Sequence, residues 1–190
     1  MTVELPPREL EARLRQEFPD IETEVGPNWL RIAAPDLLLV FRFLRDDPEL
    51  DFVFLSGLTS VDRLDAFEVV YHLQSLSRNQ IAVVKVNADR TEPSLPSASD
   101  IWYGAHLQEV EVYDLMGIRF EGHPNLRRIF LWEGFAGWPL RKDFLQAGQG
   151  AFTPGLPHFP KEGGERGTLS GPNWTAPASV PTRAADGAEE

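Results

Sequence analysis

Acidic and basic side chains follow one another closely between residues 109 and 144, and they are the first candidates for chemistry in this sequence. The acids are Glu109, Glu111 and Asp114. The basic residues that follow them are Arg119, Arg127, Arg128, Arg141 and Lys142. Planar guanidinium groups are suited to paired carboxylates, so structural neutralisation of the acids by the arginines is the simplest interpretation. A site for an anion or a substrate is the alternative.

Histidine and cysteine usage argues against a metal or redox centre in this chain. The four histidines, His72, His106, His123 and His158, show no metal-ligand spacing. Cysteine is absent, which excludes thiolate nucleophiles and iron–sulfur clusters ligated by this chain. No phosphate-binding glycine loop or nucleophile-elbow motif is present. We therefore expect no catalytic residue, no cofactor ligand and no metal ligand here.

His123 is the one histidine with a defined local setting, because Pro124 restricts it to an extended conformation. A histidine held in this way could act as an acid–base group, although anchoring a loop is the commoner role. Two tryptophans, Trp132 and Trp138, flank the short segment 133–136 and could bind a flat molecule. Aromatic residues are also typical of protein interfaces, which is the favoured interpretation for both.

The acids must be positioned by a helix that the pattern predicts over residues 101–116, with Ser97, Ser99 or Asp100 as N-cap and Gly117 after its end. A helical wheel gives two apolar stripes, so both sides of this helix should be covered. One stripe holds Ile101, Ala105, Val112, Leu115 and Met116, and the other holds Tyr103, Leu107 and Val110. Glu109 falls in the first stripe and Asp114 in the second. Both carboxylates therefore need buried partners.

The remaining pattern predicts an α+β fold with a mainly antiparallel or mixed sheet flanked by helices. Helices are expected over residues 8–18 and 35–47, and strands over 29–33, 50–58, 67–73 and 81–86. The strand over 50–58 is apolar on both faces, which favours a central position. In the strand over 67–73, Glu68 and His72 alternate with apolar residues, as expected when one face is covered. Short links predict antiparallel hairpins.

The composition divides the 190 residues into a domain over 1–144 and an extended tail over 145–190. The tail holds 8 of the 15 glycines and 6 of the 16 prolines, with few aliphatic side chains to bury. We expect the tail to become ordered against a neighbouring protein.

The formal net charge of −11 disfavours a nucleic-acid or anionic-lipid binder. No apolar run is long enough to span a membrane, and the first residues lack the features of a secretory signal, so a cytoplasmic location is expected. The segment 119–144 nevertheless carries five basic residues against three acidic ones. A basic segment in an acidic chain, with Arg141 and Lys142 beside Trp138, is typical of a docking surface.

Three successive motifs in this region resemble the C-subunit family of NADH–quinone oxidoreductase, respiratory complex I. They are Glu109-x-Glu111-x-Tyr113-Asp114-x-x-Gly117-Ile118, then Phe120-Glu121-Gly122-His123-Pro124-x-Leu126-Arg127-Arg128-Ile129, then Gly137-x-Pro139-Leu140-Arg141-Lys142-Asp143-Phe144. The motifs are long and specific over residues 102–144, and the preceding order of helices and strands agrees with the family. Two departures are Val110, where the family usually has arginine, and Leu145, where it commonly has proline.

The resemblance implies a protein of the hydrophilic arm that holds no cofactor itself, with FMN and iron–sulfur clusters in partner subunits. It implies a docking surface formed by Asp114, His123, Arg127, Arg128, Arg141, Lys142 and Asp143. The implied chief partner is the D-like subunit that helps to form the quinone pocket. The implied location is the cytoplasmic side of the cell membrane, as a peripheral protein. The complex as a whole would transfer electrons from NADH to quinone and translocate protons.

Two other functions compete with this interpretation. The same module occurs in membrane-bound hydrogenases and complexes of the formate-hydrogenlyase type. A free-standing enzyme that uses Asp114 or His123 as an acid–base group is the second alternative.

Overall fold

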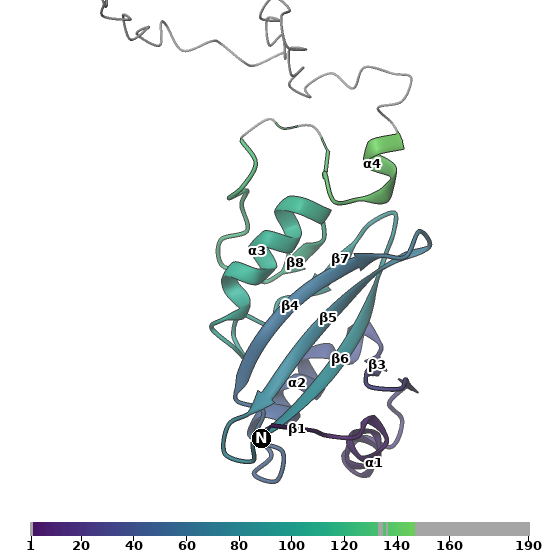
Figure 1. The fold of residues 1–190 in the computed structure, drawn as a ribbon, viewed down its shortest axis with the longest axis vertical. Helices are drawn as coiled ribbons and strands as arrows, with labels where there is room; N and C mark the ends of the chain where they lie inside the picture. Colours follow the sequence, from purple (N-terminus) through teal and green to yellow (C-terminus); the bar gives the residue numbers. More distant parts are fainter. Residues whose placement is uncertain (1, 133–134, 136, 147–190) are drawn as a thin grey trace, which may run out of the picture.

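The structure is a computed structural model that describes residues 2–132, 135 and 137–146. Its main sheet contains the strands β1 (Val3–Glu4), β2 (Thr23–Val25), β3 (Leu30–Ile32), β4 (Phe54–Asp62), β5 (Ala66–Ser75) and β6 (Gln80–Asp89). The strand order is β2-β3-β6-β5-β4, and β1 also pairs with β6. Parallel and antiparallel pairs are both present. The predicted α+β class with a mixed sheet and flanking helices is confirmed (Figure 1).

The helices are α1 (Pro7–Glu17), α2 (Leu37–Asp46), α3 (Ala105–Met116) and α4 (Lys142–Gln146), and a short 3₁₀ turn over Ala34–Asp36 leads into α2. Two further strands, β7 (Ser94–Pro96) and β8 (Arg119–Glu121), form a separate parallel pair. The first two helices lie within one or two residues of their predicted limits. The predicted tail lies outside the described residues from residue 147 onward.

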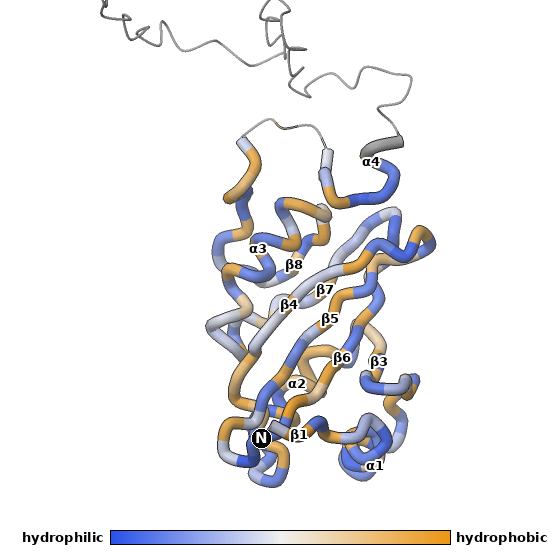
Figure 2. The backbone as a smooth tube through the Cα atoms, viewed as in Figure 1, coloured by the Kyte–Doolittle hydropathy of each residue, from blue (hydrophilic) through white to orange (hydrophobic). Residues whose placement is uncertain are grey.

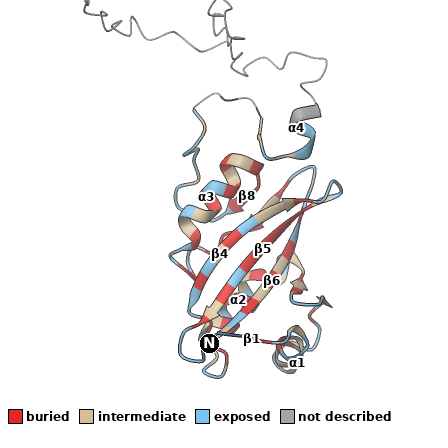
Figure 3. Ribbon diagram, in the orientation of Figure 1, coloured by how far each residue is buried: buried red, intermediate tan, exposed pale blue. Residues whose placement is uncertain are grey.

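The core lies between α2 and one face of the β4–β5–β6 meander. Phe67, Val69, Tyr71 and Leu73 of β5 are completely buried on this face. From α2, Phe41 packs edge-on against Tyr71 and Trp102, with ring centroids 4.7 and 5.0 Å apart. Figures 2 and 3 show apolar residues of the sheet coinciding with buried ones. Burial of these large side chains is the main contribution to the stability of the domain.

The predicted central strand over 50–58 is wrong in both its start and its position. The strand begins at Phe54 and lies at the edge of the sheet, beyond β5. Leu50 and Phe52 are buried from the turn after α2, where the Phe52 N–H donates to the Leu44 carbonyl at 2.9 Å. The first part of this apolar run therefore fills the core from a loop. Helix α3 packs beside the edge strand, and the Gln108 side chain accepts a hydrogen bond from the Leu58 N–H.

The predicted helix over 101–116 starts four residues late, at Ala105, with Gly104 as its N-cap. Residues 98–104 form successive turns instead, and the Trp102 indole N–H donates to the Phe52 carbonyl at 2.9 Å. Ile101 and Trp102 are thus buried as they would be in a helix. The expectation of two covered sides is also wrong in part, because Tyr103 and Leu107 are exposed and only Val110 of the second stripe is buried.

Candidate functional site

The carboxylate of Asp114 holds the segment that follows β8 against the end of α3. Asp114 has no exposed surface, and its Oδ2 accepts hydrogen bonds from the N–H groups of three consecutive residues. These are Ile129 at 2.9 Å, Phe130 at 2.7 Å and Leu131 at 3.0 Å. Hydrogen bonds from backbone N–H groups to a charged acceptor are stronger than neutral ones. The carboxylate therefore fixes the course of this segment.

Arg128, which is partly buried, provides the counter-charge that the sequence predicted for Asp114. Its Nη1 lies 3.5 Å from Asp114 Oδ1, and its Nη2 donates to the Gly137 carbonyl at 3.3 Å. The predicted neutralisation of Asp114 by an arginine that follows it in the sequence is therefore confirmed. Arg119 and Arg127 are exposed, and neither takes part in an ion pair among the described residues.

A second segment, residues 137–141, is fixed to the same end of α3 by Leu140 and Arg141. The Leu140 N–H donates to the Leu115 carbonyl at 3.1 Å, and Arg141 Nε donates to the Met116 carbonyl at 2.7 Å. Carbonyls at a helix C-terminus lack partners within the helix, and a cation there also interacts well with the helix dipole. Arg141 thus caps α3, and its burial lowers the pKa of the guanidinium.

Aromatic rings enclose the Arg141 guanidinium and explain the glycine that ends α3. The guanidinium carbon lies 4.1 Å from the centre of the Trp138 ring and 4.8 Å from that of Phe67. Gly117 adopts a positive φ of 71°, and a Cβ at this position would stand 2.3 Å from the Trp138 ring. Only glycine allows both this backbone conformation and this close approach. Trp138, expected at an interface, is half-buried against the chain itself.

Lys142 and Asp143 begin α4 beside the tip of the β4–β5 hairpin. Asp62 Oδ2 accepts the Lys142 N–H at 3.0 Å, and Arg90 bridges Asp62 at 2.6 Å and Asp143 at 3.0 Å. Burial would raise the pKa of Asp62, but the hydrogen bonds from Arg90, Lys142 and Leu64 lower it to about 2. The side chains of Lys142 and Asp143 are exposed. Of these two adjacent basic residues, Arg141 therefore faces inward and Lys142 faces the solvent.

This division predicts different effects for two neighbouring substitutions. Arg141→Gln should lower the free energy of unfolding by about 1.5–3 kcal/mol, because hydrogen bonds from a charged donor to carbonyls at the end of α3 are lost. Lys142→Gln should leave it unchanged, because only the backbone of Lys142 makes a described contact. Chemical denaturation of both variants measures the difference. Equal stability of the two variants would show that the cap contributes little.

Glu109 has a different partner from the one expected. It is fully buried on α3, but no described ion pair involves it, so its predicted neutralisation by arginine is wrong. The Ser97 hydroxyl donates to Oε2 and the Ala98 N–H donates to Oε1, both at 2.6 Å. Burial raises the pKa of Glu109 to about 7, and the nearby charge of Asp100 adds to the rise. Glu111, two residues along, is exposed and also lies outside the described ion pairs.

The raised pKa of Glu109 predicts a pH-dependent stability. Because the folded chain holds this proton up to about pH 7 and the unfolded chain releases it near 4.5, the stability contributed by Glu109 is complete below pH 4.5. It should be lost as the pH rises through 7, a change of about 3 kcal/mol. Glu109→Gln should remove this slope between pH 5 and 8 in urea denaturation, whereas Glu111→Gln should keep it. A slope that persists in Glu109→Gln would assign the titration to another group.

His123 is a loop anchor in the structure. The Asn125 N–H donates to Nδ1 at 3.1 Å, so Nδ1 is an acceptor and Nε2 carries the proton that bonds the His106 carbonyl at 3.0 Å. Burial lowers the pKa of His123, which favours this neutral form. Its ring also packs edge-on against that of His106, with centroids 4.5 Å apart. Both ring nitrogens are therefore engaged, which argues against an acid–base role.

A buried carboxylate with three cationic partners lies on the face of the sheet opposite the core, and the sequence pattern did not predict it. Glu68 of β5, expected on an exposed face, is almost fully buried and pairs with Arg63 at 2.8 Å, Arg31 at 2.9 Å and Lys85 at 3.1 Å. Burial would raise the pKa of Glu68, but these three hydrogen bonds lower it to about 2. The cations Arg31 and Lys85 also lie 4.7 Å from the centre of the Trp29 ring. In the hairpin register Lys85 lies opposite Val70, two positions beyond Glu68 on the same face of β5, which brings Lys85 within reach of the Glu68 carboxylate.

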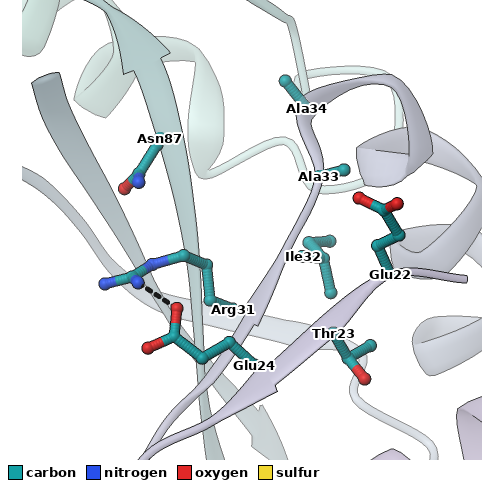
Figure 4. Close-up of a pocket in the computed structure, with 8 residues that line it drawn as sticks. All are labelled: Glu22, Thr23, Glu24, Arg31, Ile32, Ala33, Ala34 and Asn87. Atoms are coloured by element: carbon teal, nitrogen blue, oxygen red, sulfur yellow. Dashed lines mark hydrogen bonds and ion pairs between the residues drawn. The ribbon is translucent and has the colours of Figure 1, made fainter.

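Two cavities open around this cluster, away from the predicted site. One of about 390 Å³ includes Trp29, Arg63 and Lys85 in its wall. The other, of about 310 Å³, lies beside β2 and β3 (Figure 4). It is lined by Glu22, Thr23, Glu24, Arg31, Ile32, Ala33, Ala34 and Asn87. The Arg31 guanidinium is bonded to Glu24 in this view, so the basic group in the wall is already neutralised.

The described residues hold neither a cluster of metal ligands nor a helix that could span a membrane. In that part of the chain, no three acidic, histidine or cysteine side chains lie together as metal ligands would. No helix there is long and apolar enough to cross a membrane.

Comparison with known proteins gives a consistent result. Residues 30–150 match the family described as respiratory-chain NADH dehydrogenase, 30 Kd subunit. The C subunit of NADH-quinone oxidoreductase from Roseiflexus sp. (strain RS-1) is 50% identical over 149 residues, which cover 74% of this chain and 86% of that protein. The C subunit of the same enzyme from Moorella thermoacetica is 42% identical over 135 residues, which cover 69% and 90%.

Two solved structures share the fold. The trypsin-resistant fragment of Nqo5 aligns with a TM-score of 0.50 and 30% identity, over 62% of this chain and 99% of the fragment. A chain of the membrane-bound sulfane sulfur reductase, an archaeal respiratory membrane complex, aligns with a TM-score of 0.61 over 83% of this chain and 97% of that chain. Its 22% identity extends the likeness to the fold alone.

Proposed function

Because this chain belongs to the 30 Kd subunit family of respiratory-chain NADH dehydrogenase, we propose that it serves as a cofactor-free docking protein within NADH–quinone oxidoreductase. The family match over residues 30–150 is the observation that carries this proposal. As a subunit of this oxidoreductase, the chain takes part in a complex that transfers electrons from NADH to quinone. Its own contribution is to hold other subunits in position.

Several features of the chain support a docking role without catalysis. The sequence contains no cysteine, so this chain offers no thiolate ligand for an iron–sulfur centre. In this proposal FMN and the iron–sulfur centres belong to partner subunits. The most strongly positioned polar groups, Asp114 and His123, are saturated by contacts within the chain. This engagement argues against the free-standing enzyme that was considered as an alternative.

The chief partner in this proposal is the D-like subunit that helps to form the quinone pocket. The exposed charges of Lys142 and Arg127, in a chain of net charge −11, support an acidic partner. The proposed location is the cytoplasmic face of the cell membrane, as a peripheral protein. The hydrogenase-type alternative is disfavoured because the relatives with 42–50% identity are named as C subunits of NADH-quinone oxidoreductase.

Purification of the tagged chain from solubilised membranes tests this proposal. We expect it to retain the other oxidoreductase subunits, the D-like one among them, together with flavin, iron and NADH-oxidising activity. The chain dissociated from them should show no visible absorption from a bound cofactor. Retention of nickel-containing subunits instead would support a hydrogenase, and turnover of a small substrate by the purified chain alone would support an enzyme.

A further inference from the structure

Four exposed apolar residues surround the C-terminal end of α3, and we call them the α3-end surface. They are Ile129, Phe130, Trp132 and Leu140. Phe130 is 62% exposed and Leu140 is 59% exposed. In Figure 2 the tube includes an orange, apolar segment beside α3. Such clusters of exposed aromatic and aliphatic side chains are typical of protein–protein contacts.

The backbone beneath this surface is fixed although its side chains are not buried. The N–H groups of Ile129 and Phe130 donate to the Asp114 carboxylate. The Leu140 N–H donates to the carbonyl of Leu115, the residue after Asp114 in α3. Burying a carboxylate has a large desolvation cost. The side chains of Ile129, Phe130 and Leu140 remain exposed, so their burial within the chain does not offset this cost.

A fixed backbone with exposed apolar side chains is suited to binding a partner. A loop that is already ordered loses less conformational entropy on association, which increases the affinity available from the same contacts. Aromatic residues at the centre of such a surface commonly contribute most of the binding free energy. The arrangement therefore has the properties of a preorganised interface.

Charge indicates the chemistry of the partner. Arg127 and Lys142 are exposed and close in sequence to Phe130 and Leu140, and the segment 119–144 is basic while the whole chain is acidic. A partner surface with an apolar patch bordered by carboxylates would complement both the exposed apolar side chains and the basic charge beside them. A second copy of this chain is a poor match, because its overall charge of −11 would meet an equal charge.

We propose that the α3-end surface is the docking site for a neighbouring oxidoreductase subunit that presents an apolar patch bordered by carboxylates. This inference rests on the proposed function and adds the part of the molecule that makes the contact. In this arrangement Asp114 holds the backbone that carries the surface, and the four apolar side chains contact the partner.

Charged substitutions on this surface provide the first test. Phe130→Glu and Leu140→Glu each change an exposed side chain, so the melting temperature of the full chain should stay close to that of the wild type. Leu76→Glu is the matched control, because Leu76 is 60% exposed in the turn between β5 and β6. In pull-downs from solubilised membranes, the two surface variants should retain at least about tenfold less of the other subunits, a change of about 1.4 kcal/mol in binding. The control should retain the wild-type amount.

Photo-crosslinking identifies the occupant directly and remains informative if a charged variant fails to fold. A photoreactive phenylalanine analogue at position 130 should link this chain to another oxidoreductase subunit within the intact complex, and the same analogue at position 76 should not. Crosslinks only to a second copy, or to residues 147–190 of the same chain, would overturn the inference. So would normal retention of subunits by both surface variants, while the proposed function would stand. If the wild-type chain retains no oxidoreductase subunit, the proposed function fails and this inference fails with it.

Discussion

Replacing Asp114 with alanine should lower the free energy of unfolding by about 3–5 kcal/mol. The substitution leaves three backbone N–H groups without their acceptor and leaves the Arg128 guanidinium without its counter-charge. Each of these donors is at least partly shielded from water, so the loss exceeds that of a single hydrogen bond. Urea denaturation of the full chain, followed by tryptophan fluorescence, measures the effect.

Two further variants identify the cause. Asp114→Asn keeps a side-chain oxygen that can accept part of the hydrogen bonds, so its loss of stability should be smaller than that of the alanine variant. Glu49→Ala removes an exposed carboxylate that pairs with Arg13, and exposed ion pairs contribute little. Similar, small effects of Asp114→Ala and Glu49→Ala would mean that Asp114 does not hold the segment after β8.

Removing Glu68 should have an effect of similar size at the opposite side of the sheet. Glu68→Ala leaves Arg31, Arg63 and Lys85 close together without the buried carboxylate that neutralises them, and the expected loss at pH 7 is about 3–5 kcal/mol. Glu24→Ala is the matched control, because Glu24 contacts only Arg31 among these cations and is exposed. Its effect should be small.

The pH dependence of this difference follows from the lowered pKa of Glu68. The stability contributed by Glu68 is present above pH 4.5, the ordinary value, and should be lost as the pH falls through the folded value of about 2. The stabilities of the wild type and Glu68→Ala should therefore converge in acid. A difference that stays constant from pH 7 to pH 2 would mean that the stabilisation comes from packing and not from charge.

The parts of the fold predicted well are those in which periodicity and burial coincide. Val69, Tyr71 and Leu73 alternate along β5 because they all face the core, so the hairpin with β6 could be predicted. Leu50 and Phe52 are buried from a turn, and an apolar run of this kind does not distinguish a loop from a strand. The strands β1, β2, β7 and β8 are two or three residues long, too short for any periodicity.

At the candidate site, too, the sequence predicted the partner of one buried acid and not that of the other. Asp114 was recognised because a carboxylate on the apolar side of a helix needs a partner, and Arg128 supplies it. The identical argument misled for Glu109, since the hydroxyl and N–H of a nearby turn satisfy it without a cation. Which donor reaches a buried acid depends on tertiary packing. Arg141 was expected to face a partner, but it lies over Phe67, a residue 74 positions earlier in the chain.

Docking through the α3-end surface is consistent with a division of tasks between subunits. This chain offers no cysteine thiolate and holds its polar groups in contacts that maintain shape. It would therefore keep the quinone-reducing end of the complex assembled, and electron transfer would take place in its neighbours.

Two rates of NADH oxidation, measured on membranes from a strain that lacks this chain, test the docking role most directly. With an artificial acceptor that takes electrons from the flavin end, the rate should stay close to that of the wild type. With quinone as acceptor, the rate should be lost, and expression of the intact chain should restore it. An unchanged rate of quinone reduction without this chain would contradict the role assigned to it.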